Sequence, residues 1–141
     1  MKIAAALCTI LLWSVTGAAA TPAAAPAPEA AAESAARTWL ALLDAGDYAD
    51  TWSSASSMFR QKVSEPQWQS AASGTRAPLG SLKSRTLRSV TLKSALPGAP
   101  DGQYVVLQFD ASFEHKASAV ETVTPVLDAD GKWHVSGYYI R

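Results

Sequence analysis

Apolar side chains recur every four residues within residues 29–45. Ala35, Trp39 and Leu43 stand at i, i+4 and i+8, which places all three on one side of an α-helix. Gly46 follows directly, and glycine readily adopts the left-handed conformation that commonly ends a helix. The pattern therefore predicts an amphipathic helix that buries one face and ends at Gly46.

Two further helices are predicted before the middle of the chain. Asp47 is suited to cap the first of them. The apolar stripe of this helix consists of Tyr48, Trp52, Ala55, Phe59 and Val63. Ser64 and Gln67 have the spacing of a capping box, in which each side chain accepts a backbone hydrogen bond at the start of a helix. This third helix has Pro66 in its first turn and is expected to end at Gly74.

Beyond Gly80 the apolar period changes from about 3.6 residues to two, which is typical of strands. The clearest strand puts Val105, Leu107 and Phe109 on one face. Pro125 lacks a backbone donor, so its strand must leave that position unpaired or bulged. The four predicted strands are residues 82–92, 104–113, 120–127 and 132–140, with turns at 96–102 and 128–131.

Three helices followed by four consecutive strands predict an α+β domain. We expect the strands to form a curved four-stranded antiparallel sheet, with the helices gathered on one of its faces. A concave sheet lined by helices can enclose a pocket, and this cone-like form is the architecture that we predict.

The first twenty residues have the pattern of an export signal. Lys2 supplies a positive charge, residues 3–15 carry no charge, and small residues precede Ala20. Such a combination describes a secretory signal peptide, with cleavage predicted after Ala20. The alternative is an uncleaved membrane anchor, but the apolar run is shorter than the about 20 residues that a membrane span requires.

Cleavage would leave a chain without cysteine, because the only one, Cys8, lies inside the apolar run. Residues 21–28 contain three prolines and no large apolar side chain, so we expect a flexible leader. Residues 29–141 then form a single α+β domain. We expect this domain to be periplasmic or secreted, with no membrane attachment after cleavage.

The chain carries 12 basic and 12 acidic residues, which excludes a strongly basic nucleic-acid-binding protein. The charges are unevenly placed, since residues 60–93 hold seven basic residues and one acidic residue. On an ideal strand Lys83 and Arg85 point to the same side, where they would suit an anion or an acidic partner. We favour a solvated edge strand whose basic side chains prevent aggregation, because no aromatic residues are interleaved.

Five segments of the chain carry a resemblance to known proteins. They are Trp39–Tyr48, Arg76–Gly80, Leu96–Val106, Glu121–Thr124 and Gly131–Tyr139. Through them the chain resembles a bacterial family, domain of unknown function 4019 (DUF4019), over about residues 30–141. This resemblance implies an exported single-domain protein without an assigned activity. The order of helices and strands is also similar, more distantly, to the NTF2-like or cystatin-like cone of SnoaL-like and ketosteroid-isomerase-like proteins.

Metal, nucleophile and nucleotide chemistry find no support in the sequence motifs. His115 and His134 are the only histidines, and neither has a second histidine or a cysteine at ligand spacing. Residues 128–131 resemble the start of a calcium loop but lack its later ligands, so we expect a hairpin turn. We therefore expect no catalytic residue, no metal and no cofactor.

Six side chains of the helical region and the last strand are candidates for lining a pocket and binding a ligand. Core packing is the ordinary role of such aromatic residues, but inside a cone they could form an apolar wall with a few polar groups. The candidates are Trp39, Tyr48, Trp52, Trp68, Arg76 and Tyr138.

These observations favour an exported, non-enzymatic domain that binds a small ligand or a protein partner through its pocket or its sheet face. No nucleic acid is expected as a partner, and an exposed sheet face would also suit a homodimer. The rival is a small pocket-based hydrolase or isomerase of the NTF2-like type, which needs a buried carboxylate or tyrosine with a shifted pKa. The groups that could serve are Asp44, Asp110, Glu121 and Tyr138.

Overall fold

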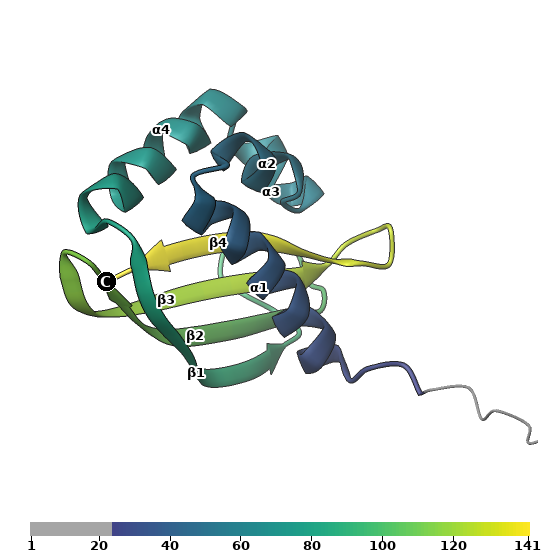
Figure 1. Ribbon diagram of the computed structural model, residues 1–141. Helices are drawn as coiled ribbons and strands as arrows, with labels where there is room; N and C mark the ends of the chain where they lie inside the picture. The colour runs from purple at the N-terminus through teal and green to yellow at the C-terminus, as the bar shows by residue number, and fades with distance from the viewer. Residues whose placement is uncertain (1–23) are drawn as a thin grey trace, which may run out of the picture.

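The computed structural model describes residues 24–141 (Figure 1). The predicted signal peptide, residues 1–20, and the first part of the predicted leader lie outside the described residues. The helices are α1 (Pro28–Ala45), α2 (Tyr48–Ser53), α3 (Ser57–Lys62) and α4 (Glu65–Arg76), followed by the short 3-10 helix η1 (Ala77–Leu79). The strands are β1 (Leu82–Lys93), β2 (Tyr104–Phe113), β3 (Lys116–Leu127) and β4 (Trp133–Ile140). Within residues 24–141, no helix has the length and apolar character needed to cross a membrane.

The four strands form one antiparallel sheet in the order β1–β2–β3–β4, so each strand pairs with its neighbour in the sequence. The helices gather on one side of this sheet, and α1 crosses over it (Figure 1). This arrangement confirms the predicted α+β class with an antiparallel sheet. The register of β3 against β4 shifts between Thr124 and Pro125, which confirms the irregularity expected at this proline.

The helix predicted from Asp47 to Val63 is broken in two, so the described chain has four α-helices rather than three. Ser56 has an extended backbone (φ −60°, ψ 155°), and its Oγ accepts a hydrogen bond from the Phe59 amide at 3.1 Å as the N-cap of α3. The Ser56 amide itself donates to the Val135 carbonyl of β4 at 2.9 Å. The Ser56 N–H thus donates its hydrogen bond to the sheet, whereas in a continuous helix it would donate to a carbonyl of the preceding turn.

Two other predicted helix ends are confirmed, but the predicted end at Gly74 is wrong, because Gly74 keeps a helical backbone and α4 continues to Arg76. Gly46 ends α1 with a φ of +81°, a conformation that costs glycine little. Ser64 and Gln67 form the complete capping box of α4, with each side chain accepting from the other residue's amide. Asp47 stands at the N-cap of α2, but its side chain makes no capping hydrogen bond, contrary to the prediction. The largest shift of a strand end is in β3, which begins at Lys116 instead of residue 120.

The core lies between α1 and the middle of the sheet. Ala36, Leu40 and Leu43 of α1 are at most 1% exposed and belong to one cluster with Leu107 and Phe109 of β2. Full burial of a leucine or phenylalanine side chain is worth about 1.5–3 kcal/mol, so this contact is a main support of the fold. The same contact determines the distance between the C-terminal end of α1 and the sheet.

Candidate functional site

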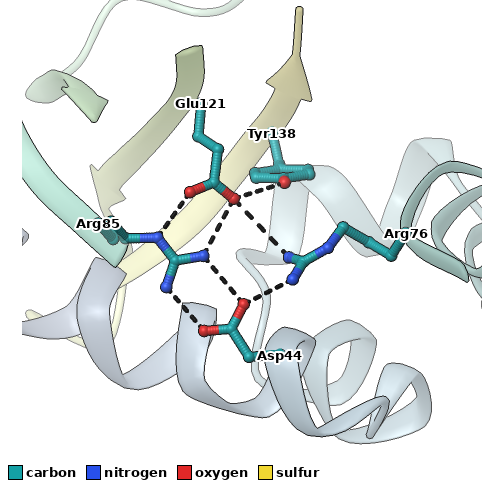
Figure 2. Close-up of polar contacts among 5 residues, drawn as sticks. All are labelled: Asp44, Arg76, Arg85, Glu121 and Tyr138. Atoms are coloured by element: carbon teal, nitrogen blue, oxygen red, sulfur yellow. Dashed lines mark hydrogen bonds and ion pairs between the residues drawn. The ribbon is translucent and has the colours of Figure 1, made fainter. Parts of the chain in front are cut away.

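Five polar side chains from five different elements meet between the helices and the sheet (Figure 2). Asp44 belongs to the last turn of α1 and Arg76 is the last residue of α4, whereas the other three come from the strands. We call this group the ion cluster; its members are Asp44, Arg76, Arg85 of β1, Glu121 of β3 and Tyr138 of β4.

Glu121 is the centre of the ion cluster and has no exposed surface. Its Oε2 accepts a hydrogen bond from Arg85 Nε at 2.6 Å, and its Oε1 accepts from Arg85 Nη2 at 3.1 Å. The Tyr138 hydroxyl donates to Oε1 at 2.7 Å, and Arg76 Nη1 lies 3.7 Å from the same oxygen. A buried carboxylate needs this number of partners, because an unpaired charge in the interior costs several kcal/mol, on the order of 3–5.

Asp44 completes the charge balance at the edge of the cluster. Its Oδ1 accepts from Arg76 Nη2 at 2.7 Å and from Arg85 Nη2 at 2.9 Å, and its Oδ2 accepts from Arg85 Nη1 at 2.7 Å. Burial acts to raise the pKa of Asp44, but the hydrogen bonds from Arg85 and Arg76 outweigh it and lower the pKa below its ordinary value. Two carboxylates therefore face two guanidinium groups, and the cluster is neutral.

The Arg76 side chain is held on its second side by an aromatic ring. Its guanidinium carbon lies 4.8 Å from the centroid of the Phe113 ring, within the range of a cation–π contact. Nε and Nη1 of Arg76 are buried and make no hydrogen bond within the described residues. The ring face and the nearby Glu121 carboxylate are the groups that compensate for the lost hydration of these two nitrogens.

The protonation states of the cluster suit structure rather than proton transfer. Burial lowers the pKa of Arg85, but its hydrogen bonds to Asp44 and Glu121 outweigh that effect and raise the pKa. Burial, together with the charge of Glu121, raises the pKa of the Tyr138 phenol. The phenol therefore keeps its proton and donates a hydrogen bond to the carboxylate. Each carboxylate already accepts three hydrogen bonds.

Arg85 was expected on a solvated edge strand and is instead part of the interior. Its side chain is 9% exposed. The register of β1 against β2 shifts around Lys83 and again around Arg88, so the simple alternation that paired Lys83 with Arg85 does not hold. Leu87, two residues beyond Arg85 and packed on the core, is the signal in the sequence that could have indicated the direction of Arg85.

The remaining carboxylate proposed for acid–base chemistry lies elsewhere. The Asp110 side chain is 60% exposed and pairs with Arg88 on the surface at 3.3 Å. Of the four groups considered for an enzyme, the structure thus brings together three, Asp44, Glu121 and Tyr138, and leaves Asp110 apart. Within residues 24–141, no three His, Cys, Asp or Glu side chains gather in a way that could hold a metal ion.

The candidate tryptophans are fixed by their indole N–H groups. Trp39 donates to the Thr51 carbonyl at 2.8 Å, and Trp68 donates to the Thr51 hydroxyl at 2.9 Å, with the two rings 5.7 Å apart. Trp52 donates to the Val63 carbonyl at 2.7 Å. Together with the half-buried Tyr48, these rings pack in or against the main core. Trp39 also lies 5.6 Å from the ring of Tyr138 and so joins the aromatic group to the ion cluster.

A groove of about 460 Å³ lies between α1 and β4 and reaches Trp39. One wall is formed by Ala35 and Leu42 of α1, and the opposite wall by Trp133 and Val135 of β4. We call it the α1–β4 groove. Its volume lies in the range of sites that bind small molecules, and its lining is more apolar than polar.

The β3–β4 hairpin forms the far rim of the α1–β4 groove and is tied to the helices. His134 Nδ1 lies 3.1 Å from the Ser54 carbonyl oxygen and its Nε2 lies 2.8 Å from Asp130 Oδ2, so both contacts are made only when both nitrogens carry protons. Partial burial lowers the pKa of His134, but these hydrogen bonds outweigh it and raise the pKa. The Asp128 carboxylate accepts from the Ser57 amide and hydroxyl, each at 2.7 Å, which lowers its pKa.

Comparison with known families adds one finding. The family model described as "Protein of unknown function (DUF4019)" matches residues 35–138, a range that includes the whole ion cluster and most of the α1–β4 groove. No curated protein matches the chain.

Proposed function

We propose that this chain, which belongs to the DUF4019 family of proteins of unknown function, is an exported, non-enzymatic domain. It binds a small apolar ligand in the α1–β4 groove. Export is supported by the signal pattern of residues 1–20. The observation that carries the non-enzymatic part is the internal pairing of both carboxylates of the ion cluster. Glu121 and Asp44 hold three hydrogen bonds each from cluster members, so neither is available to act on a substrate.

The choice of the α1–β4 groove rests on its lining. Trp133 is only partly buried and presents an aromatic face, and Trp39 behind it is held in place by the Thr51 carbonyl. Because the Ala35 side chain is small, the groove beside the two indole rings has space for a ligand. A rigid aromatic wall of this kind binds an apolar ligand with little loss of side-chain freedom.

Fluorine NMR of the purified protein, labelled with 5-fluorotryptophan, tests this proposal with indole as the probe. We expect indole to shift the signal of Trp133, because it lines the groove, and to leave that of Trp52 in place. The substitution Ala35→Phe fills the groove and should abolish the shift. The matched control is Ala71→Phe, which fills a separate hollow of about 210 Å³ beside Trp68 and should preserve the Trp133 shift. A Trp133 signal that indole does not move, or that still moves in Ala35→Phe, would refute the proposal.

A small hydrolase or isomerase is the competing function, and one observation favours it. The buried Glu121 carboxylate touches a phenol, Tyr138, whose pKa is raised, and such pairs occur in acid–base catalysis. Hydrolysis of p-nitrophenyl acetate separates the binding function from that of a hydrolase. If Glu121 and Tyr138 are a catalytic pair, the Tyr138→Phe variant should hydrolyse the ester about 100-fold or more slowly than the wild type. Under the binding proposal, the wild-type protein and the Tyr138→Phe variant both hydrolyse this ester no faster than buffer alone.

A further inference from the structure

A further hollow, of about 360 Å³, lies between α3, the loop that follows β1 and the last two strands. It shares no lining residue with the α1–β4 groove. Phe59 and Val63 form the wall on the side of α3, Leu96 and Pro97 form the wall on the side of the loop, and Thr124 lies at its base. We call it the α3 cleft.

The loop wall of the α3 cleft is fixed by hydrogen bonds at its end. The Leu127 amide donates to the Gln103 carbonyl at 2.9 Å, and the Tyr104 hydroxyl donates to the Pro100 carbonyl. The Tyr104 ring lines the cleft and is only 2% exposed. A wall held in this way is formed before any ligand arrives, so little ordering is needed on binding.

Lys62 is the one charged side chain among the residues that line the α3 cleft. Its Nζ donates to the Gly98 carbonyl across the cleft at 3.3 Å. No carboxylate within residues 24–141 lies within ion-pair distance of this ammonium group. An ammonium group has three donors, and the neutral carbonyl occupies one of them.

We infer that the α3 cleft binds a small amphipathic anion, an alkyl or aryl group that carries a carboxylate or sulfonate. The apolar part lies against Phe59, Val63 and Leu96, and the acid group meets the Lys62 ammonium. Charge complementarity selects this class, because an apolar wall with one cation at its rim favours a ligand of the opposite pattern. The site is independent of the ligand proposed for the α1–β4 groove.

Two fluorescent dyes with the same aromatic skeleton test this inference. Anilinonaphthalene sulfonate carries the acid group, and phenylnaphthylamine lacks it. In the Ala35→Phe protein, in which the α1–β4 groove is filled, we expect the sulfonate to bind about tenfold or more tightly than the neutral dye at low salt, because a hydrogen bond to a charged group contributes on that scale. Lys62→Gln should bring the sulfonate affinity down to that of the neutral dye and leave the neutral dye unchanged. The matched control is Lys83→Gln. It removes an exposed lysine at the start of β1, away from the α3 cleft, and should leave both affinities unchanged.

Two further variants assign the dye to a site. Ala99→Phe places a ring in the α3 cleft and should abolish sulfonate binding, whereas Ala35→Phe fills the α1–β4 groove and should not affect it. Loss of sulfonate binding in Ala35→Phe alone would overturn the inference and still agree with the proposed function of the groove. Equal affinities for the two dyes in the Ala35→Phe protein, no effect of Lys62→Gln, or no binding of the sulfonate at all would each overturn it as well.

Discussion

Glu121 carries a negative charge at a position without exposed surface, and it is the residue with the clearest energetic consequence. Replacing it by glutamine keeps the shape but leaves Arg76 and Arg85 facing a single carboxylate, Asp44. Removal of one partner from a buried ion pair costs about 3–5 kcal/mol. We therefore expect Glu121→Gln to lower the free energy of unfolding by this amount, measured by urea denaturation.

The control for this prediction is the same chemical change at an exposed pair. Asp110→Asn removes the surface contact with Arg88, and exposed pairs of this kind contribute at most about 1 kcal/mol. A Glu121→Gln protein as stable as Asp110→Asn would show that the ion cluster is not the support that its geometry indicates.

At the scale of elements, α4 has a start that the sequence encodes in full. The Ser64 side chain accepts a hydrogen bond from the Gln67 amide, and loss of such a cap costs about 0.5–2 kcal/mol. We expect Ser64→Ala to destabilise the protein within this range, again by denaturation. Ser70→Ala, at an exposed position inside the same helix, should be neutral or slightly stabilising, because alanine is the better helix former. Equal effects of the two variants would contradict a capping role.

At the scale of the whole molecule, charged contacts link segments that are distant in the sequence and make stability depend on pH. The pKa values of Asp44 and Asp128 are lowered from 3.8 on folding. Their stabilising contributions are therefore present above that value and are lost as the pH falls through the lower folded-state pKa. The pKa of His134 is raised from 6.5, so its contribution is present below that value and is lost as the pH rises through the higher folded-state pKa.

Stability is thus expected to be greatest at about pH 5–6 and to fall on both sides. Denaturation midpoints measured across the pH range provide the test. Asp44→Asn should be less stable at neutral pH and less sensitive to acid than the wild type. His134→Gln should lose the decline on the alkaline side. A midpoint that rises steadily below pH 4 would contradict the assigned role of the carboxylates.

Much of the fold could be predicted from local patterns. The helix that buries Trp39, the capping box at Ser64, the order of the strands and the irregularity at Pro125 were all predicted from the sequence. In each case the cause lies within a few residues: the apolar period shows which face leaves water, and a cap or a proline acts on its own backbone. The sequence identifies Arg76 and Tyr138 as polar groups among aromatic residues and Glu121 as a possible acid–base group, but no local pattern shows that Glu121 contacts both of them.

What the sequence determines by itself is therefore the order of the helical and strand segments and most of the faces that they bury. Only the tertiary structure decides that Ser56 breaks a helix, because the group that takes its amide belongs to β4. Only the tertiary structure turns Arg85 inward, because a buried charge is tolerated where opposite charges meet it, and Asp44 and Glu121 come from other elements. Local periodicity shows which side chains are buried away from water. The pairing of charges depends on distances between segments that are far apart in the chain.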